Sequence, residues 1–321
     1  MEDSFIKDLC SKCTTSEAAG QRTSRTAGCA CLMLGNLAVT DDVSTRLASD
    51  MVPVSTLLRD LGSSNDSMFL NAAAGLLRHL AIPMENRELF FGEEETLQQV
   101  AHLYTDVTLE QVQVAGLQLT RQVLANMAER TRRFIEQHGT PSLDTVITLF
   151  KETTSTATRL EVSRLLTVIL RALQSPSSPG LYDVCLRTLV NTPDVLLPAV
   201  FAIRQSPAPN VLTAQAEAWL TLNLFVRAPG GAVTLATQTC NDEELLSLLR
   251  QRIKISGNEI AETVGEGAEA EPQDTRPRWV KDKERDNAVL LVHDLLKADD
   301  VEEGVKHVLR SLLEESDIRI G

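Results

Sequence analysis

Aromatic residues are scarce in this sequence, at 4% of 321 residues, although hydrophobic residues make up 43%. No apolar run approaches the roughly 18 residues that a membrane-spanning helix needs. The opening residues, Met1 to Ser4, lack the basic and apolar regions of a signal peptide. Six cysteines in a chain of this length suit a reducing compartment. We therefore expect a cytoplasmic protein whose core consists of small aliphatic side chains.

The sequence also lacks the motifs of catalysis. It contains no phosphate-binding glycine loop, no dinucleotide fingerprint and no nucleophile elbow, and its five histidines are scattered. Cys10-x-x-Cys13 and Cys29-x-Cys31 superficially resemble zinc spacing, and they are the only support for a metal- or thiol-dependent enzyme. Residues two apart on a helix point about 200° apart, so we interpret these cysteines as buried structural thiols. We expect no enzyme, no metal and no cofactor.

Positive charge is in deficit, because 31 lysines and arginines face 44 aspartates and glutamates for a net charge of −13. Such a surface repels phosphate, which disfavours nucleic acid and anionic membranes as partners. It favours a basic protein or peptide tail, unless the acidity serves only solubility. Glu93, Glu94 and Glu95 start a predicted helix, where carboxylates are favourable, and we consider them candidates for meeting a basic tail.

What the chain does contain is a repeat. Related helix ends occur at Leu34–Ala38, Leu76–Pro83 and Thr120–Leu124, at 43-residue intervals. A repeat of this length built from apolar helices indicates an armadillo or HEAT solenoid. The first complete unit has short, medium and long helices over about 41–49, 53–61 and 67–82, and this order is the armadillo plan. Asp41 and Asp42 are expected to cap the first of these helices, and Gly62 to end the second.

We predict an all-α, armadillo-type, right-handed superhelical solenoid of about five to six repeats. Residues 1–22 are expected to be a leader or partial repeat, 23–255 the repeats, 256–278 an acidic disordered loop, and 279–321 the last repeat and C-terminal cap. The other predicted helices span 23–38, 86–91, 94–104, 109–126, 129–137, 142–151, 158–173, 181–189, 195–204, 212–226, a pair ending near 255, 280–297 and 301–316.

We call the long, last helix of each repeat its third helix. Aligning the third helices places one mostly polar column in register: Asn36, His79, Gln122, Ala172, Asn223 and Asp294. The residues three before and one after this column are apolar in every copy, so they share one helix face. Arg78, Arg121 and Arg171 precede the column in three copies. Third helices line the concave groove of armadillo arrays. We therefore predict a partner-binding ladder of hydrogen-bonding side chains there; the alternative is that these residues cap helix ends inside the solenoid.

Trp219 and Asn223 form W-x-x-x-N, the spacing with which importin-type armadillo proteins hold basic signals. That mode needs several such pairs, and the matching positions here hold Leu32, Gly75, Gln118, Val168 and Leu290. A core tryptophan is therefore the favoured interpretation, with a scaffold for extended basic peptides as the alternative.

Two segments resemble one family in particular. Leu77–Pro83 followed by Asn86 is similar to the L-R-N-L-A-I-P…N segment of the SmgGDS family of small-GTPase GDP dissociation stimulators. Ser163–Leu166 with Ile169–Arg171 is similar to its S-R-L-L…I-R segment, and Ala30–Ala38 to its helix ending in N-F-A. The resemblance covers roughly residues 23–250, corresponding to the C-terminal half of that family, and His79 stands where the family has Asn.

The resemblance implies an armadillo protein that binds Rho- or Rap-type GTPases with polybasic, prenylated tails. Such a protein stimulates GDP release or chaperones the GTPase by binding alone, without covalent chemistry. We expect a monomer that contacts the G domain and the basic tail. A general armadillo scaffold or adaptor for extended basic peptides is the alternative function.

Overall fold

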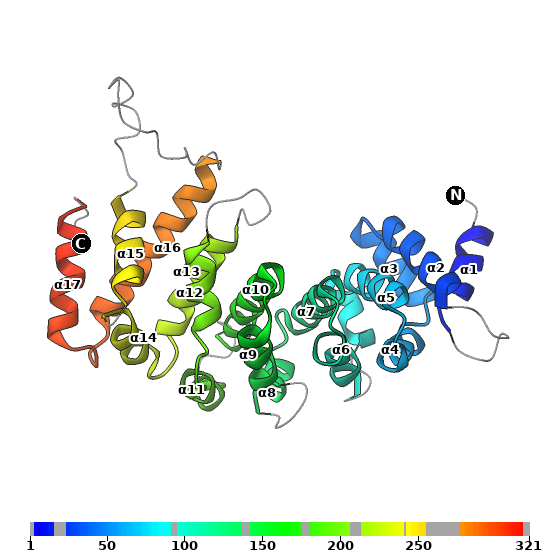
Figure 1. Ribbon diagram of the computed structural model, residues 1–321, viewed down its shortest axis with the longest axis horizontal. Coiled ribbons are helices and arrows are strands. Elements are labelled where there is room, and N and C mark those ends of the chain that lie inside the picture. The colour runs from blue at the N-terminus through cyan, green and yellow to red at the C-terminus, as the bar shows by residue number, and fades with distance from the viewer. Residues whose placement is uncertain are drawn as a thin grey trace, which may run out of the picture. The chain divides into compact units, whose positions relative to one another are not determined.

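The computed structural model describes residues 3–15, 24–90, 95–136, 142–174, 180–205, 213–240, 242–254 and 277–316. All regular secondary structure in these ranges is helical (Figure 1). The chain divides into two compact units, Met1–Val168 and Ile169–Gly321. No described helix is long and apolar enough to cross a membrane.

The first unit contains α1 (Asp3–Lys12), α2 (Ser24–Leu37), α3 (Asp41–Asp50), α4 (Val54–Ser63), α5 (Ser67–Leu80), the 3-10 helix η2 (Met84–Phe90), α6 (Glu95–Thr105), α7 (Glu110–Leu124), α8 (Ala128–Glu136), α9 (Leu143–Glu152) and the start of α10 (Thr156–Leu173). The second unit takes in the rest of α10 and contains α11 (Asp183–Asn191), α12 (Leu197–Arg204), α13 (Ala214–Val226), α14 (Gly231–Cys240), α15 (Glu243–Lys254), α16 (Arg278–Lys297) and α17 (Glu303–Glu314).

The helices follow the predicted order closely, with two local corrections at their ends. Thr40, not an aspartate, caps α3 by accepting a hydrogen bond from the Val43 amide, and Asp41 and Asp42 lie in the first turn. Gly62 does not end α4, which continues to Ser63. At the N-terminus, α1 packs on α2 and buries Leu9. Most of the predicted acidic loop lies outside the described residues.

Third helices pack side by side in the first unit, where α2 contacts α5 and α5 contacts α7. Two glycines seven residues apart allow the first contact. A Cβ on Gly28 would lie 3.4 Å from Phe69 Cα, and one on Gly35 would lie 3.7 Å from Leu76 Cα. The backbones therefore approach closely because glycine leaves room on this face.

The apolar positions beside the column form the packing face in most copies. Leu76 and Leu80 are buried in α5, as are the matching residues of α7, the end of α10 and α16. Two copies differ. In the first, Met33 is 44% exposed and Leu37 is half-buried, and in α13 both matching leucines are half-buried.

Side chains of the following helix satisfy the carbonyl groups at three successive third-helix ends. Ser44 Oγ donates to Ala38 O at 3.3 Å, Asn86 Nδ2 to Leu80 O at 2.8 Å, and Thr131 Oγ1 to Leu124 O at 3.4 Å. These bonds supply partners for carbonyls that a helix leaves without one.

Arg87 joins the ends of two third helices. Its guanidinium donates to Ala81 O at 3.2 Å and Ile82 O at 3.0 Å, just beyond α5, and to Ala125 O at 2.6 Å, just beyond α7. Burial lowers the pKa of this arginine, which remains a cation shared among backbone carbonyls. Asn86 and Arg87 together fix the geometry of the segment that carries the family resemblance.

In the second unit α13 packs against α16. Asn223 Nδ2 donates to Asn287 O at 2.8 Å, and Asn287 Nδ2 donates to Ala216 O at 2.9 Å. Trp219 is 1% exposed, as favoured for a core tryptophan. Of the W-x-x-x-N pair, Asn223 therefore joins two helices inside this unit, and Trp219 is part of the core.

Candidate functional site

Three consecutive third helices of the first unit, α2, α5 and α7, border a cleft of about 290 Å³. We call it the third-helix cleft. Its polar lining consists of four amide side chains, one arginine and one histidine: Asn36, Asn71, Arg78, His79, Gln111 and Gln118. The cleft therefore offers hydrogen-bond donors and acceptors with little ionic charge.

Helix periodicity explains why these side chains share one surface. Asn71, Gly75 and Arg78 follow one another at helical spacing on α5, and Gln111, Val114 and Gln118 do so on α7. The sequence prediction included Asn36, Arg78 and His79 but missed Asn71, Gln111 and Gln118. The missed residues lie one to three turns before the polar column. Continuing the column along each helix would have found them.

Gly75 forms an open part of the cleft. A Cβ built on this residue would have no atom within 4 Å. Gly116, on the packing side of α7, is the opposite case, because its Cβ would lie 2.7 Å from Leu103 Cβ. Packing therefore requires a glycine at position 116, whereas at position 75 the missing side chain leaves space that a ligand backbone can approach.

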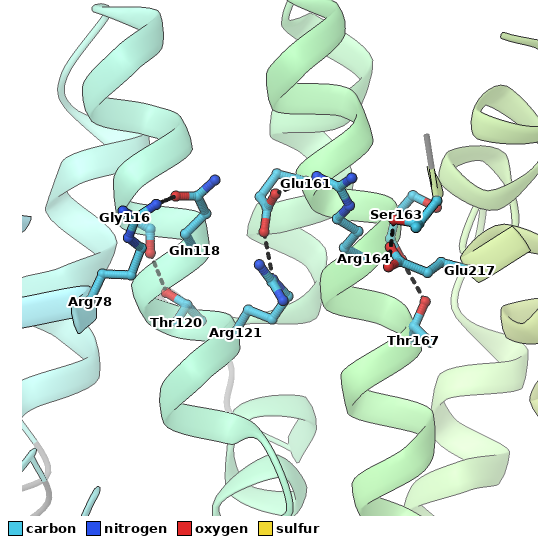
Figure 2. A network of polar contacts seen from close by, with 11 residues as sticks. Arg78, Gly116, Gln118, Thr120, Arg121, Glu161, Ser163, Arg164, Thr167 and Glu217 are labelled. Atoms are coloured by element: carbon cyan, nitrogen blue, oxygen red, sulfur yellow. Dashed lines mark hydrogen bonds and ion pairs between the residues drawn. The ribbon is translucent and has the colours of Figure 1, made fainter. Parts of the chain in front are cut away.

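Arg78 lies between two neighbours that fix its orientation. Its Nη1 donates to Gln118 Oε1 at 2.6 Å (Figure 2). Its Nη2 lies 3.0 Å from His79 Nε2. A guanidinium has no acceptor, so His79 must accept this bond through an unprotonated Nε2. Burial and the adjacent Arg78 charge both lower the pKa of His79, in agreement with a neutral ring.

Arg121 likewise extends from its own helix, α7, and contacts the next third helix, α10. Its Nε donates to Glu161 Oε1 at 2.6 Å, and Arg164 Nη1 donates to Glu161 Oε2 at 3.3 Å (Figure 2). Glu161 is 1% exposed, so this buried carboxylate depends on its two arginines. Arg121 is thus engaged in an ion pair within the first unit, which differs from both the predicted ladder and the helix-capping alternative. Gln122 beside it is half-buried and outside the cleft lining.

Arg171 does not continue the arginine series. Arg78, Arg121 and Arg164 recur at 43-residue intervals, and Arg164 is the one that binds Glu161. Arg171 lies two turns further along α10, in the second unit, and is exposed. The sequence alignment followed the apolar positions at the helix end, and the length of α10 displaced it from the arginine spacing.

Two predicted members of the column make contacts within the second unit. Asn223 is completely buried between α13 and α16, and its amide is used in the backbone contact described above. Asp294 accepts a hydrogen bond from Arg227 Nε at 2.7 Å. Because α16 covers this face of α13, the surface position predicted for Asn223 is wrong. Asp294 is half-buried on α16 itself, and its role in partner binding stays a prediction.

The structure does not describe the side chains of the acidic cluster Glu93–Glu95. Glu93 and Glu94 lie outside the described residues, and Glu95 opens α6 with its side chain not described. Their contact with a basic tail stays a prediction.

The cysteines are mostly structural, as predicted. Cys10, Cys13, Cys31 and Cys185 are buried, and burial raises the pKa of the Cys10 thiol to about 11. Cys29 is exposed, contrary to the prediction for that residue. Within the described ranges no group of three or more His, Cys, Asp or Glu side chains could hold a metal.

Comparison with known proteins assigns the fold. No family model and no curated protein matches the chain. The designed armadillo repeat protein YIII(Dq)4CqI is similar with a TM-score of 0.63 and 13% identity, over 90% of this chain and 99% of that one. Designed armadillo protein YIII(Dq.V1)4CPAF, solved in complex with the peptide (KR)4, gives a TM-score of 0.61 and 14% identity over 90% and 99%.

SYS-1 is a third structural neighbour, with a TM-score of 0.63 and 14% identity over 99% of this chain and 59% of that one. At these identities the likeness concerns the fold. The chain therefore has the armadillo-repeat fold predicted from its helix order, in which the third helices form the face that borders the cleft.

Proposed function

We propose that this chain is an armadillo scaffold that binds an extended segment of a partner protein in the third-helix cleft. The observation that carries the proposal is the combination of amide side chains with the open surface at Gly75. Asn and Gln each offer a donor and an acceptor, so they can pair with the peptide groups of an extended chain whatever its side chains. One of the structural neighbours was itself solved with a bound peptide.

This function needs binding and no covalent step. Burial of a few apolar side chains adds to the hydrogen bonds, and Leu32, which is 46% exposed, supplies apolar surface at the cleft. A segment that is already extended pays less ordering entropy when it binds. We therefore expect affinity to depend on several weak contacts along the cleft.

The test is to close the cleft at Gly75. A displayed library of random peptides is selected on the wild-type protein, and the affinity of each selected peptide is measured by fluorescence anisotropy. Gly75→Leu fills the open space, and we expect it to weaken binding by at least about tenfold, or roughly 1.4 kcal/mol. Gly75→Ala is the matched control, because it also restores helix propensity but projects only a methyl group.

Peptides whose affinity for Gly75→Leu equals that for the wild type would bind elsewhere and would overturn the proposal. Folding of both variants is checked by circular dichroism and urea unfolding. Since no atom lies within 4 Å of a Cβ at position 75, Gly75→Ala should not disturb the packing of α5, and the unfolding measurements establish whether the larger leucine does.

A narrower proposal is that the partner is a small GTPase of the Rho or Rap type with a polybasic, prenylated tail. Its support is the resemblance carried by Leu77–Pro83 and Asn86, together with the armadillo fold. In the structure Asn86 donates a hydrogen bond to the carbonyl at the end of α5. The match to the family at this residue therefore reflects the geometry of the repeat. The described lining of the cleft contains no carboxylate, so a basic tail would bind outside it.

Exchange of nucleotide would follow from binding the nucleotide-free GTPase more tightly than its GDP form. In the test, Rho- and Rap-type GTPases are loaded with labelled GDP. The release of GDP is then measured with and without this chain at physiological salt. Accelerated release with a stable complex supports the proposal. Unchanged release and no complex across the panel would exclude this partner while leaving the peptide scaffold intact.

A further inference from the structure

The third-helix cleft has an unusual balance of charge for a chain with a net charge of −13. None of its lining residues is a carboxylate, and Arg78 is the only lining residue that is always ionised. His79 is held neutral because its Nε2 accepts a hydrogen bond from Arg78. The local charge of the cleft is therefore positive although the protein is acidic.

Arg78 also has unused donors in a fixed orientation. A guanidinium carries five N–H bonds, and the contacts with Gln118 and His79 use one on each Nη. The remaining donors form part of a planar fork, which matches the two oxygens of a carboxylate. Because Gln118 and His79 already restrain the side chain, a ligand loses less entropy in ordering it.

The charge of Glu110, which lies outside the cleft, weakens this preference only slightly. Glu110, exposed at the start of α7, lies eight residues before Gln118, or about 12 Å along a helix axis. The Debye length at physiological salt is about 8 Å, so exposed charges at that distance are largely screened. A ligand atom in contact with Arg78 therefore interacts more strongly with that arginine than with Glu110.

We infer that the cleft selects an extended peptide segment bearing an aspartate or glutamate, whose carboxylate binds Arg78 while its backbone passes over Gly75. This inference rests on the proposed function, since it specifies the segment that the scaffold takes. It also departs from the basic peptide expected from net charge, because contacts in the cleft are decided by its own lining.

The test uses a cleft-binding tracer, namely a selected peptide whose affinity falls with Gly75→Leu. Three eight-residue competitors are compared at physiological salt: alternating Glu and Ser, alternating Gln and Ser, and alternating Lys and Ser. We expect the Glu peptide to compete at least about tenfold better than the Gln peptide, in the range of a charge-assisted hydrogen bond. The Lys peptide should compete least well.

Arg78→Gln should abolish the difference between the Glu and Gln peptides. Arg171→Gln is the matched control, because it removes the same charge from an exposed site outside the first unit and should preserve the difference. Arg78→Lys should restore it only in part, since an ammonium cannot form the planar fork.

The failures of the two proposals are distinguishable. If the tracer binds in the cleft but the Glu peptide competes no better than the Gln or Lys peptide, the inference is overturned and the scaffold function stands. A preference that survives Arg78→Gln also overturns it. If selection yields no peptide sensitive to Gly75→Leu, both the function and the inference fall.

Discussion

The polar column of the third helices has different surroundings in the two units. In the first unit Asn36 is exposed and His79 lies in the lining of a cleft. In the second unit Asn223 is completely buried and donates to a backbone carbonyl of α16. The same position in a repeat is therefore accessible in one unit and used for internal cohesion in the other, depending on whether another helix covers it.

The largest expected effect concerns a pair of arginines, one from each unit. Arg121→Ala removes the 2.6 Å partner of the buried Glu161 and leaves only the longer bond from Arg164. Uncompensated buried charge is costly, so we expect a loss of about 2–4 kcal/mol in the free energy of unfolding. Arg171→Ala, at an exposed site, should change it by less than about 0.5 kcal/mol. Urea denaturation measures both.

A second substitution separates the buried charge from lost packing. Adding Glu161→Gln to Arg121→Ala removes the charge that has lost its partner, so stability should partly recover. Equal stability of the single and double variants would show that Arg121 acts through packing of its stem, and would contradict the ion-pair account.

The next prediction compares the two asparagines directly. Asn223→Ala removes a completely buried side chain and its hydrogen bond to the Asn287 carbonyl, which should cost about 1–3 kcal/mol. Asn36→Ala, at an exposed position, should lie within about 0.5 kcal/mol of wild type. Thermal and urea unfolding of the pair decide the matter. Similar losses at both positions would mean that the first-unit residue is also structural.

Two glycines on third helices provide a comparison within the first unit. Gly116→Ala places a Cβ 2.7 Å from Leu103 Cβ, and we expect overpacking to cost about 1–3 kcal/mol. Gly75→Ala meets no atom within 4 Å, and better helix propensity should stabilise the protein by up to about 1 kcal/mol. In urea denaturation we expect the two substitutions to change the free energy of unfolding with opposite signs. Lower stability in both variants would show that the cleft wall at position 75 is packed.

The sequence was sufficient for the fold because repeat and periodicity are local signals. Short, medium and long helices with apolar faces at 43-residue intervals predicted the armadillo class, and helix bounds agreed to within a few residues. The site could be predicted only in part. Asn36, Arg78 and His79 were found, but burial of Asn223 depends on α16, which follows far along the chain. Arg87 and Glu161 were missed because their roles depend on the relative placement of neighbouring repeats.

The smallest expected effect is on the titration of His79, and it tests whether the cleft is neutral except for Arg78. Burial, and then the Arg78 charge, lowers the pKa of His79 below its usual 6.5. The unfolded chain therefore binds a proton more readily, so this residue's contribution to stability is present above pH 6.5 and is lost as the pH falls through the folded pKa. Histidine NMR signals followed against pH should show a depressed value for His79. Arg78→Gln should raise that value while leaving it below 6.5, since burial, the larger cause, remains. An unchanged pKa in this variant would contradict the Arg78–His79 contact and, with it, the orientation of the guanidinium in the cleft.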